Sequence, residues 1–265
     1  MLLVCAKPSG ISSFDVVKII RTHFQDKVGH SGTLDPMASG LMILGVGKGT
    51  KELTSLIGLD KSYETTIDFS LLTDTWDASF WEKEEKFEVS YWVLEANIWT
   101  PGFNREEQKN PGVNSYLIKD WKLILAPGLD QITALLDTIL YNEEREILLP
   151  LPTFSAKKQN GKRLYKDARK GKAEIQEKPM KIYRYEVLDY KFPLLKLRLE
   201  VGSWTYIRSI GYRLGQQLGL GGALVQLERI STGNFKLSSI GTDCFAKGNI
   251  KGQERVIYFR EVGLG

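Results

Sequence analysis

The sequence predicts an α+β domain, in which helices and strands are mixed without a regular order. Apolar residues recur at helical spacing in some segments and alternate or run together in others, and these segments do not follow a strict strand–helix–strand succession. The chain has 265 residues, 42% hydrophobic and 26% charged, which suits a soluble globular protein with a substantial core. No internal repeat is visible, and this excludes solenoids and propellers.

A helix and two strands are predicted in the N-terminal part. Ser12 or Ser13 can cap a helix over residues 13–24, whose apolar residues recur at helical spacing. Residues 41–46 form an apolar run bounded by glycines, and residues 63–69 place Tyr, Thr, Ile and Phe on one face. Both segments are therefore predicted to be strands.

The C-terminal half predicts further helices and a pair of strands. Asp130 can cap an amphipathic helix, and residues 162–170 predict a shorter, very basic helix. Residues 182–188 and 195–201 are typical of paired strands, and residues 206–218 are typical of another amphipathic helix. We expect strands and helices to pack as one mixed domain.

Charge is unevenly distributed, although the formal net charge is only +4. Residues 155–171 contain seven Lys/Arg and one Asp, whereas residues 74–110 contain nine Asp/Glu and four Lys/Arg. The basic run predicts a surface that attracts phosphates, although an ordinary solvated helix face would have the same composition. The segment 78–125 is acidic, aromatic and interrupted by prolines, and we interpret it as an insertion.

The sequence lacks the features of exported and membrane proteins. No stretch reaches the roughly 18 apolar residues that span a bilayer, and no basic residues precede the apolar start. Cys5 and Cys244 lie far apart, and neither has a CxxC partner, which argues against a disulfide framework and against a cysteine zinc site. We therefore expect a cytoplasmic protein.

The glycine-rich segment 28–51 is where chemistry is most strongly indicated. It contains Asp35, a lone carboxylate that precedes Pro36. A P-loop would need GxxxxGK[ST] after a strand, and Gly45–Lys51 does not supply that pattern, so a nucleoside triphosphatase is rejected. Taken alone, an Asp before Pro is more often a turn-stabilising residue than a catalytic one.

Several motifs accompany this segment along the chain. They are KPSGISSFDVV (7–17), GHSGTLDPMASGL (29–41), GKGTK (47–51), KSYETTIDF (61–69), TDTWD (73–77), SAKKQNGKRLYKDAR (155–169), TYIRSIG (205–211) and LERISTGNF (227–235). Together and in this order, they closely resemble the motifs of the TruB-type tRNA pseudouridine synthases, the tRNA pseudouridine-55 synthase family. The resemblance covers nearly all of residues 5–77 and 150–235.

The resemblance implies a fold, a reaction and a catalytic set. It implies a pseudouridine synthase catalytic fold, with a central, mostly antiparallel sheet flanked by helices, and conversion of uridine to pseudouridine in the T-arm loop of tRNA, at position 55. Asp35 matches the catalytic aspartate, which attacks the sugar or base or abstracts a sugar proton, so that the N-glycosidic bond breaks and C5 joins the ribose. Arg208 matches the arginine paired with it, and Tyr63 a pocket tyrosine. No cofactor and no metal is implied.

The resemblance also implies contacts with RNA. His30 matches the residue that takes the space left by the flipped nucleotide, and Leu227 an apolar residue packed against the flipped uracil. By themselves, Tyr63 and Leu227 would be interpreted as core residues and Arg208 as a surface charge. The other expected contacts with RNA or the pocket edges are Lys7, Lys158, Lys162, Arg163, Tyr165, Tyr206 and Arg229.

Three tryptophans depart from the family pattern. Trp76, Trp81 and Trp204 stand where the family usually has glycine, and bulky residues are awkward in such turns. We hypothesise that the source reads UGA codons as glycine and that the sequence was translated with tryptophan at them. Mass spectrometry of peptides from the native protein, finding Trp at 76 and 204, would refute this hypothesis.

The expected organisation is a catalytic domain over residues 1–240, with the insertion at about 78–125. Residues 241–265 are expected to form a short tail without a complete PUA domain. The expected partner is tRNA, bound by a monomer that needs no obligatory protein partner and no membrane. Two alternatives remain open, a non-catalytic tRNA-binding protein or tRNA-folding chaperone, and a guide-dependent rRNA pseudouridine synthase.

Overall fold

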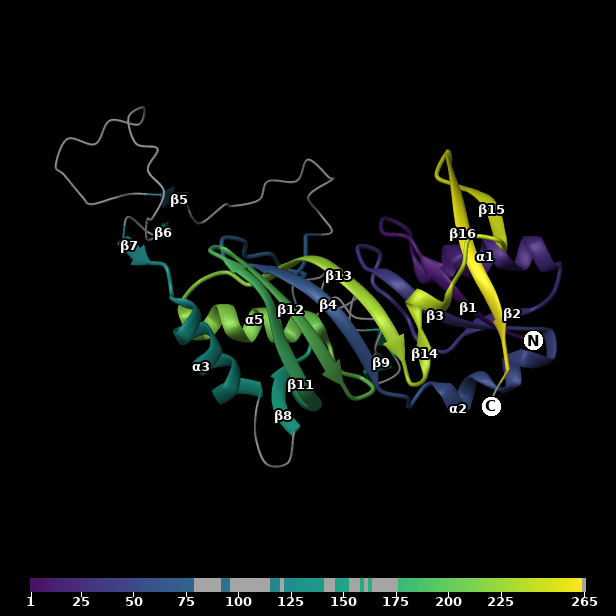
Figure 1. Ribbon diagram of the computed structural model, residues 1–265, viewed down its shortest axis with the longest axis horizontal. Coiled ribbons are helices and arrows are strands. Elements are labelled where there is room, and N and C mark those ends of the chain that lie inside the picture. Colours follow the sequence, from purple (N-terminus) through teal and green to yellow (C-terminus); the bar gives the residue numbers. More distant parts are fainter. Residues whose placement is uncertain are drawn as a thin grey trace.

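The computed structural model is built around one long mixed sheet (Figure 1). It describes residues 1–78, 92–95, 115–119, 122–140, 146–152, 158–159, 162–163 and 176–263. Its helices are α1 (Ser13–Phe24), α2 (Leu53–Leu56), α3 (Leu129–Leu140) and α5 (Ile207–Leu218), with 3-10 turns η1 (Gly47–Lys51) and η2 (Leu237–Ser239). In this described part, no helix is long and apolar enough to cross a membrane.

The main sheet has 11 strands. They are β1 (Leu2–Lys7), β2 (Val28–His30), β3 (Ser39–Val46), β4 (Lys61–Asp68), β8 (Glu146–Pro150), β11 (Glu177–Lys191), β12 (Leu194–Val201), β13 (Ala223–Thr232), β14 (Phe235–Lys236), β15 (Phe245–Ile250) and β16 (Gln253–Val262). The path runs β15-β16-β1-β3-β13-β4-β12-β11-β8, with β2 paired to β3 and β14 to β13. All these named strand pairs are antiparallel except β3 with β13, so the predicted α+β fold is confirmed.

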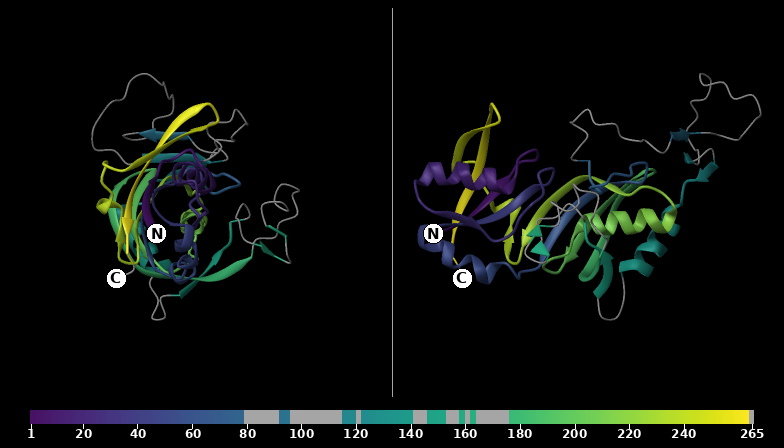
Figure 2. Two further views of the ribbon diagram at one scale, coloured as in Figure 1. Left: turned by 90° about the vertical axis from the view of Figure 1, so that its right-hand side faces the viewer. Right: turned by 180° about the vertical axis from the view of Figure 1, so that it is seen from behind.

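The sheet has two halves that meet at β3 and β13. The first half, β15-β16-β1-β3 with β2, packs on α1; in the second, α5 contacts β13 and β8, and α3 contacts β11. Figure 2 shows α3 and α5 on one side of this second half. The parallel contact between the halves consists of two residue pairs, Glu228↔Ser39 and Arg229↔Gly40. The relative position of the two halves therefore depends on a short junction.

The local signals for α1 are confirmed. The Ser12 side chain accepts from the Asp15 N–H, and the Asp15 carboxylate accepts from the Ser12 N–H, which forms a capping box. The buried side of α1 includes Val16, Val17 and Ile20, which pack in the main core. A cap and an apolar face are thus enough to define this helix.

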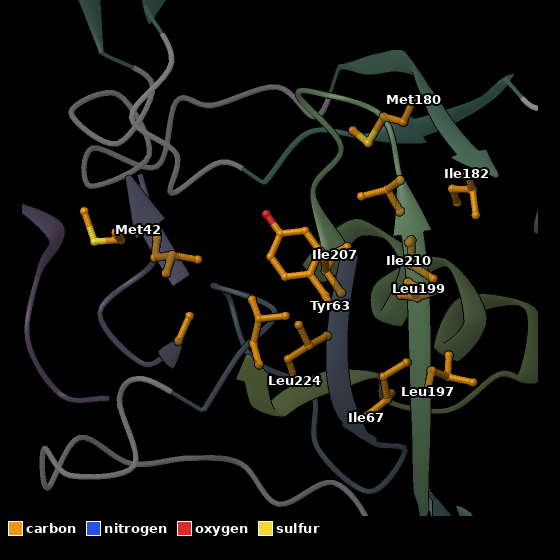
Figure 3. Close-up of a cluster of buried hydrophobic side chains, with 14 of the residues drawn as sticks. Met42, Tyr63, Ile67, Met180, Ile182, Leu197, Leu199, Ile207, Ile210 and Leu224 are labelled. Carbon is orange, nitrogen blue, oxygen red and sulfur yellow. The ribbon is translucent and has the colours of Figure 1, made fainter. Parts of the chain in front are cut away.

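The second half of the sheet encloses an apolar core (Figure 3). Ile67 of β4, Leu197 and Leu199 of β12 and Ile210 of α5 are completely buried. In Figure 3 the hydroxyl of Tyr63 points away from these side chains. The core therefore supports β4 on one side and leaves the Tyr63 hydroxyl directed away from the apolar side chains.

Some local predictions were wrong. Asp130 lies within the first turn of α3 rather than capping it, and the N–H of Gly128 donates to Gln131 Oε1 instead. The expected basic helix at 162–170 does not begin at Lys162, because Lys162–Arg163 forms β10, which pairs with β9 (Lys158–Gln159). The remainder of that helix lies outside the described residues.

The expected insertion and tail both contain strands. Within 78–125 the structure describes β5 (Trp92–Glu95), β6 (Ser115–Lys119) and β7 (Lys122–Leu125), which form a separate antiparallel sheet. Within 241–265, β15 and β16 form a hairpin, and β16 pairs with β1. The C-terminal segment thus extends the main sheet.

Gly40 should be essential for the junction. A Cβ at this position would lie 2.4 Å from the Arg229 carbonyl oxygen, and the φ of Gly40 is +109°. Gly40→Ala should therefore destabilise the protein by more than about 3 kcal/mol in urea unfolding. Gly58→Ala is the matched control, because nothing lies within 4 Å of the Cβ it would add. Equal unfolding midpoints for the two variants would contradict this account of the junction.

Candidate active site

A cavity of about 400 Å³ lies where the two halves of the sheet meet. One wall is the loop between β2 and β3, which carries Asp35, and we call residues 31–38 the catalytic loop. The opposite walls come from the start of β4, the segment 202–208 and β13. Its lining includes His30, Asp35, Lys61, Tyr63, Trp204, Tyr206, Arg208, Leu227 and Arg229. Seven of the predicted site residues thus share one cavity.

Asp35 and Arg208 form an ion pair across this cavity. Arg208 Nε lies 2.9 Å from Asp35 Oδ2, and Arg208 Nη2 donates to Asp35 Oδ1 at 3.2 Å. The arginine side chain is 4% exposed and the aspartate side chain 33% exposed. Because a fork of two contacts fixes both carboxylate oxygens, Asp35 is oriented while still facing solvent.

Asp77 is a second carboxylate that sequence reasoning did not single out. Its Oδ2 lies 3.6 Å from Arg208 Nε, its Oδ1 accepts from the Thr75 hydroxyl, and it is buried. Arg208 Nη1 also donates to the Thr75 carbonyl at 2.8 Å. The TDTWD motif contains both residues, but only the fold brings them to Arg208. Arg208 is thereby held from behind by the segment that follows β4.

Two buried cations, Lys7 and Arg229, and the hydroxyl of Ser13 hold the catalytic loop. Lys7 Nζ donates to the carbonyls of Pro8, Pro36 and Ala38, and Ser13 Oγ bonds both the N–H and the carbonyl of Leu34. Burial lowers the pKa of Lys7 to about 8, with the Asp35 charge acting in the opposite direction. Lys7 is only 1% exposed. It therefore lies beneath the loop rather than on a surface open to RNA.

Arg229 is also buried, at 3% exposed. Its Nε donates to the Leu41 carbonyl at 2.7 Å, and its Nη2 donates to the Gly32 carbonyl at 3.3 Å. The guanidinium consequently joins β13, β3 and the catalytic loop.

The remaining predicted residues occupy different places. Tyr63 and Leu227 are nearly buried and line the cavity, as does Tyr206. The pKa of His30, another lining residue, is lowered by burial and then by the charge of Arg229. The backbones of Lys158, Lys162 and Arg163 belong to β9 and β10, and Tyr165 lies outside the described residues.

Lys61 is a lining residue that no sequence signal identified as functional. Its Nζ donates to the carbonyls of Ile57 and Leu59 and to Ser203 Oγ, which itself donates to Ile57. Burial, and then the charge of Arg229, lowers the pKa of Lys61 to about 8. Lys61 thus ties the start of β4 to the segment that carries Tyr206 and Arg208.

Two of the unusual tryptophans adopt a backbone conformation that favours glycine. Trp76 has φ 60° and Trp204 has φ 70°. Trp76 is buried and stacks on Tyr212, with ring centroids 4.1 Å apart, whereas Trp204 is 70% exposed at the cavity rim. Trp81 lies outside the described residues. Glycine at 204 would relieve strain with little loss of packing.

The described residues contain no group of three or more His, Cys, Asp or Glu that could hold a metal ion. The polar groups of the cavity are instead arranged around a single partly exposed carboxylate. Such a site can perform nucleophilic or proton-transfer chemistry.

Comparisons with known proteins agree on one family. Residues 19–98 and 130–207 match the model of the TruB family pseudouridylate synthase N-terminal domain. The chain is 33% identical to tRNA pseudouridine synthase B of Chloroherpeton thalassium over 248 residues, covering 91% of this chain and 86% of that protein. It is 34% identical to tRNA pseudouridine synthase B of Clostridium novyi, covering 92% of this chain and 71% of that protein.

The fold is similar to that of larger solved proteins. A chain in the crystal structure of a Cbf5–Nop10–Gar1 complex matches with a TM-score of 0.56 and 22% identity, covering 89% of this chain and 50% of that chain. A chain in the structure of an H/ACA RNP bound to a substrate RNA matches with a TM-score of 0.54 and 20% identity, covering 89% and 48%. These likenesses concern the fold alone.

The activity should depend on the protonation of Lys61. An ammonium group can serve three acceptors, whereas the neutral amine formed above about pH 8 has only two N–H groups. Wild type should therefore be about fivefold more active than Lys61→Met at pH 7. This ratio should fall toward one as the pH rises through about 8, because Lys61 loses its proton there. The pKa of Lys7 is also lowered to about 8, but Lys7 is present in both proteins, so its titration does not change the ratio. A ratio that stays constant from pH 6.5 to 9.5 would be evidence against this role.

Trp204→Gly should stabilise the protein by about 1 kcal/mol, because glycine adopts a positive φ without steric cost and the exposed indole contributes little packing. The free energy of unfolding in urea is the measurement, and Gly58→Trp is a control for adding or removing an indole at an exposed turn. A loss of stability in Trp204→Gly would show that the indole is an adapted part of the rim.

Proposed function

Because the chain belongs to the TruB family of pseudouridylate synthases and is a tRNA pseudouridine synthase, we propose that it modifies the uridine at position 55 in the T-arm loop, with Asp35 as the essential carboxylate. The observation that carries this proposal is the partly exposed Asp35, oriented by the buried Arg208 in a cavity that Tyr63 and Leu227 also line. An isolated nucleoside, flipped out of an RNA loop, has the size and polarity for such a site.

The chemistry requires one bond to break and another to form. The N1–C1′ bond of the uridine breaks, the base rotates, C5 bonds to C1′, C5 loses a proton and N1 gains one. Asp35 either attacks the sugar or base or removes a sugar proton to start this sequence. The product is an isomer of the substrate, so electrons and atoms balance without a further reactant.

The residues around Asp35 have separate roles in the proposed reaction. Tyr63 presents an aromatic ring for stacking on the flipped uracil, and Leu227 an apolar contact on the pocket wall. Arg208 holds the carboxylate, and Asp77 holds Arg208. His30, at the mouth of the catalytic loop, fills the space vacated by the nucleotide.

The proposed RNA surface extends beyond the cavity. The basic run at 155–171 supplies Lys158, Lys162, Arg163 and Tyr165 for contacts with the phosphates and bases of the T arm. The proposed catalytic domain spans residues 1–240, with 78–125 as its insertion. The protein is proposed to work in the cytoplasm as a monomer without an obligatory protein partner.

Purified protein should convert the T-loop uridine of an unmodified tRNA transcript. Asp35→Asn should lower the rate by about 10³-fold or more, because the amide can neither attack nor accept a proton. Carbodiimide-dependent primer extension maps the product, and Asp243→Asn, which changes an exposed carboxylate, is the matched control.

The same assay separates the alternatives. A tRNA carrying cytidine at position 55 should give no stop at that position. Modification at another uridine would overturn the T-loop assignment. Tight tRNA binding without any modification by wild type would favour the non-catalytic chaperone, and modification that needs a guide RNA would favour the rRNA enzyme.

A further inference from the structure

The junction between β3 and β13 lies directly beneath the catalytic loop. Arg229 of β13 pairs with Gly40 at the start of β3, two residues after the loop ends. The first half of the sheet carries Asp35, and the second half carries Tyr63, Arg208 and Leu227. Any movement at this junction would therefore change the position of Asp35 relative to its partners.

The Arg229 side chain spans the junction and reaches the loop. Nε donates to Leu41 in β3 and Nη2 to Gly32 in the loop, while Nη1 lies 3.5 Å from where a Cβ of Gly32 would be. A guanidinium has donors in a fixed planar fork, so these contacts set the distance between the loop and β3. An ammonium on a flexible stem could not fix two acceptors in this way.

The burial of Arg229 argues against a contact with RNA phosphate. The residue is 3% exposed, and two of its nitrogen atoms already donate to backbone carbonyls. A phosphate that displaced either of these donors would leave a buried carbonyl without a partner, which costs about 1–3 kcal/mol. Arg229 is among the residues that line the cavity, and its contacts with two backbone carbonyls favour a role within the protein over a contact with RNA phosphate.

We infer that Arg229 is a positioning residue, which holds the catalytic loop in the position where Asp35 contacts Arg208. The inference rests on the proposed function of Asp35. It assigns Arg229 an effect on the chemical step and none on the attraction between the protein and tRNA. A displacement of about 1 Å at a reacting group can cost roughly 10²-fold in rate.

Arg229→Gln should lower the single-turnover rate constant by about 10²-fold at saturating enzyme. Its Kd for tRNA should stay within about threefold of wild type, and the slope of log Kd against log salt should be unchanged, because no phosphate contact is lost. Arg229→Lys keeps the charge but not the fork, so it should recover only part of the rate. A weaker Kd with a salt slope reduced by roughly 0.7–0.9, and an unchanged rate constant at saturation, would overturn the inference in favour of a phosphate contact.

Hydrogen–deuterium exchange gives a readout that does not require turnover. In Arg229→Gln, amides of residues 31–38 should exchange faster than in wild type, while α5 should be unaffected. Glu228→Gln is the matched control, because Glu228 accepts from Ser39 Oγ across the same junction but makes no described contact with the catalytic loop. Unchanged exchange in the loop of Arg229→Gln would overturn the inference.

The two measurements separate failure of this inference from failure of the proposed function. The rate is measured at whichever uridine wild type modifies, so a different target position would not affect the comparison. Should wild type prove inactive, the proposed function fails, and the exchange data alone decide whether Arg229 holds the loop. Should Arg229→Gln fail to fold, Arg229→Lys, compared with wild type in both measurements, provides the decision.

Discussion

The parallel contact between β3 and β13 is the constraint on which the site depends. It joins the half of the sheet that carries Asp35 to the half that carries Arg208, and it consists of two residue pairs. The contact forms because Gly40 has no Cβ, which lets its backbone approach that of Arg229. Neither half contains all three of the proposed catalytic residues, because Asp35 lies in the first and Tyr63 and Arg208 in the second. The cavity is therefore a consequence of joining two antiparallel sheets, with its polar groups converging at the seam.

The catalytic loop is irregular, and irregular backbone near a core needs partners for its polar groups. Lys7 and Ser13 supply them from the first half of the sheet, and Arg229 supplies them from the second. Burying a lysine and an arginine is unfavourable unless their donors are satisfied. Here Lys7 donates to three backbone carbonyls and Arg229 to two. These hydrogen bonds replace those that each cation would make to water. These hydrogen bonds fix the backbone of the loop at several points, which a site for positioning a nucleoside requires.

Features of the fold and the site were predictable from the sequence where the interacting residues lie close together along the chain. The Ser12 cap of α1 is a local signal, and the α5 segment and the β11–β12 pair follow from local apolar patterns, so all three were predicted from the sequence. Motifs led to Asp35, Tyr63 and Arg208, whose assembly in one cavity needs the fold. The resemblance implied that Lys7 and Arg229 contact RNA or the pocket edges, and a lysine or arginine in a sequence carries no sign of its burial. The partners that bury them lie up to 197 residues away. Asp77 was overlooked because its burial and its contact with Arg208, which comes from a distant segment, appear only in the fold.

The pairing of one arginine with two carboxylates has a consequence for the proposed reaction. Whether Asp35 attacks the substrate or accepts a proton, it loses its negative charge at that step. With Asp35 as its sole partner, Arg208, which is 4% exposed, would become an uncompensated buried cation at that moment, and such a charge costs several kcal/mol. Asp77, whose Oδ2 lies 3.6 Å from Arg208 Nε and which is itself buried, is a second carboxylate beside the guanidinium. The Thr75 carbonyl holds Nη1 at the same time. Arg208 can therefore remain in place while Asp35 reacts, and it is still there to receive the carboxylate when the product is released.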